Sequence, residues 1–241
     1  MRKPLIFSTL FCLLLITTSY AQTKKVAVVT FYAVKKIGVS TFGDAATAAV
    51  TQLVDDPNFN MSPLLQNFHD QFFNTYSKDF PFQLLPEAEI TGNAEYKAYN
   101  PAGEATGGVF KDNYNLPFEG YKIVLPLIGR QNENALLKIF NQADGVMKVY
   151  IDFDLVKVGF GGMGLVKVNA HTNIALFNKA GDKVFSIRSD AKSKGGSPLI
   201  AGIPVLKADK ILPMCESALN ELMITLQKDM PKMIKKADSK L

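Results

Sequence analysis

Hydrophobic and polar residues alternate with a period of two along the second half of the chain, the pattern of strands with one buried face. Residues 147–155 place apolar side chains at every second position, and residues 166–176 repeat the pattern. A turn sequence at 178–182 precedes a third segment of the same kind, residues 183–189. The pattern predicts a three-stranded antiparallel meander.

The first half of the chain has a different pattern. Residues 24–32 (KKVAVVTFY) are rich in β-branched and aromatic residues, which predicts a strand buried on both faces. Apolar residues between 62 and 76 recur at helical spacing, with Pro63 in the expected first turn. We also expect a short strand at 82–85. Further helices are expected at 43–56, at 132–142 and after residue 209.

The C-terminal helix contains a possible stop signal, and the loop before it is unusual. We expect Asp209 to cap this helix and Pro231 to kink or end it, with a frayed basic tail at 232–241. The Gly and Pro content of residues 195–206 (GGSPLIAGIPVL) predicts a loop, yet these residues are strongly apolar. This loop is therefore expected to pack on another part of the protein.

These elements together predict an α/β fold in a single domain, residues 22–241. The expected sheet is mixed and five-stranded, includes the C-terminal meander and is packed by helices. Residues 91–120 differ from their surroundings, because eleven of these 30 residues are Gly, Pro or Asn. We interpret them as a surface excursion with at most a short helix near 95–99.

The first 21 residues have the three-part pattern of a secretory signal peptide. Arg2 and Lys3 form a basic start, a 12-residue apolar run follows, and small residues precede Ala21. A membrane-spanning helix needs about 20 apolar residues, so we expect cleavage after Ala21 and not an anchor. Cys12 lies inside the apolar run, which argues against lipid attachment. We expect an exported, soluble protein that is periplasmic or secreted.

The mature chain carries little charge and little recognisable chemistry. Loss of Arg2 and Lys3 lowers the formal net charge from +5 to +3, which is not typical of nucleic-acid binding. Cys215 is then the single cysteine, and we interpret it as a buried apolar residue. We expect no transmembrane segment in the mature chain and no nucleic-acid partner.

Neither a metal site nor a cofactor is predicted. The two histidines are too few for the usual zinc ligand set. Glycines at 38 and 43 have the spacing of a phosphate-binding loop, but Asp44 stands where Lys is needed. We therefore expect no cofactor and no metal.

Six polar residues occupy alternating positions of the expected meander that should face solvent: Asp152, Asp154, Lys167, Asn169, His171 and Arg188. An Asp and a His on neighbouring strands can pair for acid–base catalysis. The same arrangement also serves as a solvated face with cross-strand charge pairs. We favour the solvated face, because the sequence shows no pocket around these residues.

The alternation slips at the end of the first long strand, where Val158, Phe160, Met163 and Leu165 surround a glycine-rich turn. Either a bulge redirects the strand, or the end of the hairpin is apolar on a new face. The apolar residues are expected to be covered by the 195–206 loop or by a partner. Val158, Phe160, Met163 and Leu165 are therefore the candidate partner-binding residues.

The order of elements resembles the small α/β domain shared by the TolB amino-terminal domain, curli-secretion lipoproteins and activators of penicillin-binding proteins. The matching parts are KKVAVVTFY, the aromatic helix and FQLL, then Ala143-Asp144-Gly145-Val146, the hairpin and the closing helix. The resemblance implies a non-catalytic envelope domain that binds proteins. The excursion at 91–120, the absence of propeller repeats and the missing lipoprotein cysteine depart from that pattern.

Two functions follow from these observations. The first is an exported, non-enzymatic binding or assembly protein of a Gram-negative cell envelope, which contacts an envelope protein or a second copy of itself. The alternative is a periplasmic hydrolase or small-ligand-binding protein with its site under residues 91–120, using Asp152, Asp154 and His171. A pocket beneath that excursion reaching His171 favours the alternative. Membrane contact is not favoured.

Overall fold

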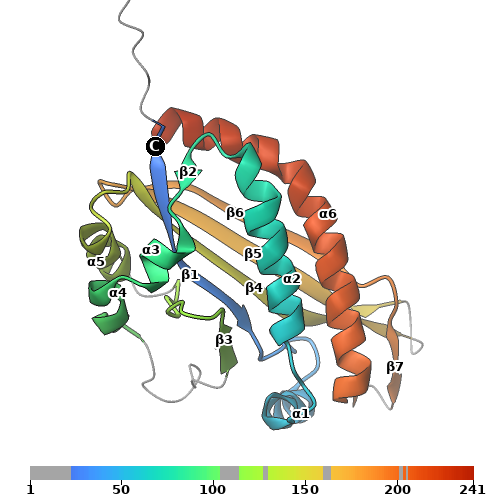
Figure 1. The fold of residues 1–241 in the computed structure, drawn as a ribbon. Coiled ribbons are helices and arrows are strands. Elements are labelled where there is room, and N and C mark those ends of the chain that lie inside the picture. Colours follow the sequence, from blue (N-terminus) through green and yellow to red (C-terminus); the bar gives the residue numbers. More distant parts are fainter. Residues whose placement is uncertain (1–22, 104–113, 127–129, 160–163, 201–202, 205) are drawn as a thin grey trace, which may run out of the picture.

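The computed structural model describes residues 23–103, 114–126, 130–159, 164–200, 203–204 and 206–241. Within these residues the strands form a mixed sheet, and α2 and α6 lie across one of its faces (Figure 1). The strands are β1 (Lys25–Val34), β2 (Gln83–Leu84), β3 (Asn115–Pro117), β4 (Gly145–Val158), β5 (Leu165–Asn178), β6 (Lys183–Lys192), β7 (Ser197–Ile200) and β8 (Ile203–Pro204). The helices are α1 (Asp44–Asp55), α2 (Ser62–Asn74), η1 (Tyr76–Asp79), α3 (Glu87–Thr91), α4 (Ala94–Ala98), α5 (Gln131–Ile139) and α6 (Ala208–Lys240).

The predicted α/β class and meander are confirmed. β1 pairs in parallel with β2 on one side and with β4 on the other. β4, β5 and β6 follow as antiparallel neighbours. The sheet contains eight strands in the described residues and not five, because three short strands (β3, β7 and β8) add to its edges and one end. These strands have two to four residues each, too few for alternation to reveal them.

The apolar segment expected as a loop at 195–206 contains β7 and β8. β7 pairs with the start of β5, where Leu165 lies opposite Pro198 and Val166 opposite Ser197. On its other side β7 pairs with β8, where Leu199 lies opposite Pro204. The expectation that this segment packs on the protein is therefore confirmed, whereas its description as a loop was wrong.

The C-terminal helix is longer than the sequence suggested. α6 runs through Pro213 and Pro231 to Lys240 and bends over the sheet towards the start of β1 (Figure 1). Asp209 lies in its first turn, and the residue at the cap is Lys207, which makes no capping hydrogen bond. Met230 and Ala237 are buried. Continued packing of this apolar stripe offsets the hydrogen bond lost at Pro231.

An aromatic cluster joins α2 to the sheet. Phe68 and Phe72 of α2 are fully buried against Phe31 of β1, with ring centroids 5.6 and 5.7 Å from it. Tyr76 of η1, just after α2, donates a hydrogen bond to the carbonyl of Met223 on α6, which ties η1 to α6. Burial raises the pKa of Tyr76 to about 12. One core thus holds elements from both halves of the chain.

The segment at 91–120 is tied to the sheet at several points. It contains α4 and then β3, which pairs with the end of β1. Tyr96 is fully buried and donates to the carbonyl of Val29, while its hydroxyl accepts a hydrogen bond from the amide of Lys122. Residues 104–113 of this segment and the predicted signal peptide, residues 1–21, lie outside the described residues.

Candidate binding surfaces

The polar residues singled out in the sequence lie on the face of the sheet opposite α2 and α6. Two of them meet directly, since Nε2 of His171 lies 2.8 Å from Oδ2 of Asp154 on the neighbouring strand. The side-chain nitrogen of Asn169 lies 3.3 Å from the same ring nitrogen. Lys167 turns away and donates to the carbonyl of Lys194. The structure therefore brings three members of the predicted set together and separates Lys167 from them.

The ionisable groups of this cluster perturb one another. The hydrogen bond to Asp154 raises the pKa of His171, and the same bond lowers the pKa of Asp154. Burial raises the pKa of Asp152. Arg188 adds a positive charge that favours the ionised forms of Asp152 and Asp154. The hydrogen bond between His171 and Asp154 therefore favours the charged form of each partner.

The cluster is less exposed than the expected solvated face. His171 and Asn169 are each only 7% exposed, whereas the side chain of Asp154 is 44% exposed. Gly38 lies beside Asp154 in a parallel bridge, and a Cβ at this glycine would overlap Oδ1 of Asp154. A His–carboxylate pair can orient a general base. None of the five cavities considered in the described part of the chain is lined by His171.

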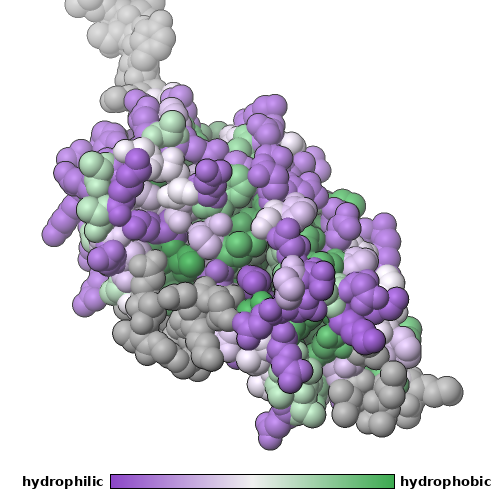
Figure 2. Space-filling view, turned by 60° about the horizontal axis from the view of Figure 1, so that its bottom comes forward, coloured by the Kyte–Doolittle hydropathy of each residue, from purple (hydrophilic) through white to green (hydrophobic). Residues whose placement is uncertain are grey.

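The tip of the β4–β5 hairpin carries two of the predicted partner-binding residues. Val158 and Leu165 are directly paired across the two strands and are 37% and 47% exposed. The register runs from Gly145 to Val158 without a shift, so the slip in alternation reflects an apolar strand end and not a bulge. Phe160 and Met163 lie outside the described residues. Figure 2 shows hydrophobic patches among the hydrophilic residues on the face that it brings forward.

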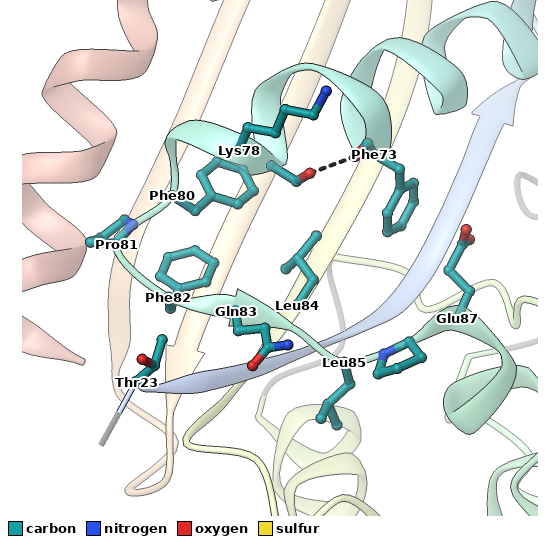
Figure 3. A pocket seen from close by; sticks show the side chains of 12 residues that line it. Thr23, Phe73, Lys78, Phe80, Pro81, Phe82, Gln83, Leu84, Leu85 and Glu87 are labelled. Carbon is teal, nitrogen blue, oxygen red and sulfur yellow. Dashed lines mark hydrogen bonds between the residues drawn. The ribbon is translucent and has the colours of Figure 1, made fainter. Parts of the chain in front are cut away.

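A second apolar surface lies at the opposite edge of the sheet, beside β2. There an open groove of about 780 Å³ runs between η1, β2 and the start of α3 (Figure 3). Its walls hold the stacked rings of Phe80 and Phe82, with centroids 4.9 Å apart. Phe73 and Leu84 add further apolar surface, and Lys78 lies at the rim. The groove therefore offers aromatic walls next to an edge strand.

The far end of this groove is fixed by hydrogen bonds. Glu87 lines the groove and accepts hydrogen bonds through Oε1 from the Tyr121 hydroxyl at 2.9 Å and from Nε2 of His69 at 2.7 Å. His69 also stacks on Phe118, with ring centroids 3.7 Å apart. These contacts join α2, α3 and the end of the 91–120 segment. The groove therefore has a rigid end.

Sequence analysis did not identify this groove. The signal available was the short strand at 82–85 between aromatic residues and Pro86. What the sequence could not show is that β2 occupies one end of the strand order. An edge position depends on which strands pair, and that is decided by the whole fold.

Metal and membrane chemistry receive no support from the described residues. These residues contain no group of three or more His, Cys, Asp or Glu side chains placed to hold a metal ion. Cys215 is fully buried, and burial raises the pKa of its thiol, as expected for an unreactive cysteine. No helix in the described part of the chain has the length and apolar character needed to cross a membrane.

Comparisons with known proteins give only distant likenesses. No protein-family model matches the chain, and no match to a curated protein was found. A hemagglutinin homolog from Helicobacter pylori is 10% identical, with a TM-score of 0.38 over 91% of each chain. Lipoprotein GNA1162 from Neisseria meningitidis is also 10% identical, with a TM-score of 0.33 over 87% of this chain and 99% of that protein. Both likenesses are too distant to indicate a function for this chain.

Proposed function

We propose that this protein is an exported, non-enzymatic binding protein of a Gram-negative cell envelope that acts through protein–protein contacts. The observation that carries the proposal is the aromatic groove beside edge strand β2 (Figure 3). Export rests on the signal peptide predicted from residues 1–21. The resemblance to protein-binding envelope domains stays a prediction and agrees with this function.

The backbone of β2 supports binding of an extended segment. The amide of Gln83 donates to the carbonyl of Lys24, which directly precedes β1, and the amide of Leu85 donates to the carbonyl of Val26 on β1. In a strand, successive amides point to opposite sides, so the amide and carbonyl of Leu84 point away from β1. An exposed edge of this kind can accept another strand.

The groove walls support the same occupant. A partner strand added to β2 presents every second side chain to the groove, where Phe80, Phe82 and Phe73 offer aromatic contacts. Lys78 and Glu87 lie among the lining residues and can contact polar groups at the ends of the segment. The expected partner is therefore a protein with an extended, partly aromatic or aliphatic segment.

The alternative of a hydrolase or small-ligand site beneath residues 91–120 has less support. It required a pocket beneath residues 91–120 that reaches His171. Among the described residues, the five cavities considered are lined neither by His171 nor by any residue from 91 to 120. Asp154 likewise lines none of these five cavities in the described part of the chain. We therefore favour the binding function over catalysis.

Two substitutions at one position test the proposal. Leu84→Pro removes the outward amide but keeps the amides of Gln83 and Leu85, which bond to β1. Leu84→Ala is the matched control, because it shortens the same side chain and keeps the amide. A photocrosslinking residue placed at the exposed Gln83 reports contact in cells.

We expect a specific crosslinked adduct in the native host that Leu84→Pro abolishes and Leu84→Ala retains. The melting temperatures of both variants, measured by circular dichroism, should be similar. The proposal fails if Gln83 gives no adduct, or if Leu84→Pro leaves the adduct unchanged.

A further inference from the structure

A second cavity lies on the polar face of the sheet, under the start of α5. It has a volume of about 280 Å³ and is more enclosed than the β2 groove. The residues that line it come from α5, the three meander strands and the segment before α5. This cavity is distinct from the groove and the hairpin tip described above.

A buried ion pair contributes to the cavity wall. Nζ of Lys148 on β4 donates to Oε1 of Glu133 on α5, and both side chains are at least 95% buried. Oε2 of the same carboxylate has no hydrogen-bond partner among the described residues. A buried carboxylate oxygen without a donor is unfavourable. This oxygen therefore needs a hydrogen-bond donor that the described residues do not provide.

Cations are in excess around the cavity. Arg130, Lys148 and Lys183 line it, and Glu133 is the single carboxylate among the lining residues. Asp182 pairs with Arg130 at 3.1 Å, but both side chains are more than 60% exposed, so solvent weakens that pair. The positive charge of Lys183 then remains to attract an anion.

Two of these cations lie near the aromatic wall of the cavity. Nζ of Lys148 lies 5.4 Å from the ring centroid of Phe177, and Nζ of Lys183 lies 5.7 Å from it. Tyr150 and Asn173 line the same space, where Ser186 donates to the amide oxygen of Asn173. An apolar ring with nearby amide, hydroxyl and ammonium groups is a typical wall for a small polar ligand.

We propose that this cavity binds a small organic anion that also carries hydroxyl groups. The anionic group lies at the mouth, against Lys183 and Arg130. A hydroxyl group donates to Oε2 of Glu133 and satisfies the orphaned oxygen. The carbon skeleton packs on Phe177. If the ion pair serves only to attach α5 to the sheet, the cavity binds none of these groups.

The test uses four probes titrated into the purified mature protein by calorimetry. D-gluconate carries both a carboxylate and hydroxyl groups, D-glucitol carries only hydroxyl groups, and hexanoate carries only the carboxylate. Inorganic phosphate tests for an anion without a carbon skeleton. We expect gluconate to bind about tenfold more tightly than each of the other three, because each missing contact to a charged group costs roughly that factor.

Two lysine variants locate the site. Lys183→Gln removes a cation at the mouth and should weaken gluconate binding about tenfold. Lys179→Gln is the matched control, since this exposed lysine lies in the same β5–β6 turn region but does not line the cavity. It should leave gluconate binding unchanged. Neither variant alters the buried ion pair, so both should fold.

Three results would overturn the proposal. The first is that none of the four probes binds. The second is that phosphate, glucitol or hexanoate binds as tightly as gluconate, which excludes the hydroxylated organic anion. The third is an equal effect of Lys183→Gln and Lys179→Gln, which indicates attraction to the surface as a whole.

Discussion

The face of the sheet beneath α2 and α6 is filled by apolar side chains, whereas the opposite face makes several of its buried contacts through charges. Phe31, Phe68 and Phe72 pack on the first face without exposed surface. The second face buries the Lys148–Glu133 pair and holds His171 against Asp154. Packing depends on shape, but charge pairs depend on protonation and on both partners being present. The two faces should therefore respond differently to mutation and to pH.

The largest expected effect is on the apolar face. Phe72→Ala removes a fully buried ring that contacts Phe31 and Phe73 and leaves a cavity. We expect a loss of about 3–5 kcal/mol in the free energy of unfolding. Urea denaturation at pH 5 and pH 7 should give the same loss at both values. A loss that depended strongly on pH would contradict the distinction between the two faces.

Breaking the buried ion pair should have the next largest effect. Lys148→Met leaves the carboxylate of Glu133 buried without its cation, and we expect a loss of about 3 kcal/mol. This is the lower end for such a change, because the cavity beside Glu133 can admit water.

The double variant Lys148→Met/Glu133→Leu is the control for that prediction. It removes both charges, so it should recover most of the stability, as measured by the same urea denaturation. If the double variant is as unstable as the single one, packing and not charge holds α5 to the sheet.

The His171–Asp154 pair should give a smaller effect that depends on pH. The raised pKa of His171 means that its contribution is complete below its ordinary value of 6.5 and fades as the pH rises through the raised pKa. The lowered pKa of Asp154 means that its contribution is complete above its ordinary value of 3.8 and fades as the pH falls through the lowered pKa. The pair is therefore strongest between these two values.

Asp154→Asn tests that window. Because Asp154 is 44% exposed, solvent screening limits the pair to about 1 kcal/mol, or about 2–4 °C in melting temperature. The difference between the original protein and the variant should be largest near pH 5 and should shrink towards pH 9. A difference in melting temperature that grew with rising pH would contradict the raised pKa of His171.

The smallest effect on stability is expected at the hairpin tip, where both faces end. Val158→Ser/Leu165→Ser changes two exposed side chains and should alter the free energy of unfolding by no more than about 0.5 kcal/mol. If the tip is a second contact site, the double variant loses association in crosslinking and sedimentation experiments. Ile224→Ser, at another exposed apolar residue, is the matched control and should change neither property.

A larger loss of stability at the tip would change the interpretation. A decrease above about 2 kcal/mol would show that Val158 and Leu165 belong to the core with β7. Unchanged association and stability would remove the tip from the candidate partner-binding surfaces and leave the β2 groove.

Much of the fold was predictable because its signals are local. The alternation at 147–155 and 166–176 predicted β4 and β5, and the helical spacing after residue 62 predicted α2. A buried face imposes a period of two or 3.6 on neighbouring residues, so one strand or helix reveals itself without the rest of the chain. The same local reasoning identified the exposed apolar residues Val158 and Leu165 at the hairpin tip.

Only the tertiary structure decided where these elements leave an edge strand, a cavity or a buried ion pair. In the sequence, Lys148 looks like any exposed polar residue of a strand, and Glu133 looks like any exposed polar residue of a helix. The fold nevertheless buries them together as an ion pair. Likewise, Gln83 and Leu84 form a groove wall only because β2 pairs with β1 on one side and with no other strand in the described residues. Sequence periodicity records whether a side chain faces the core. It does not record which distant residue lies opposite, because pairing across more than one element depends on the packing of the whole chain.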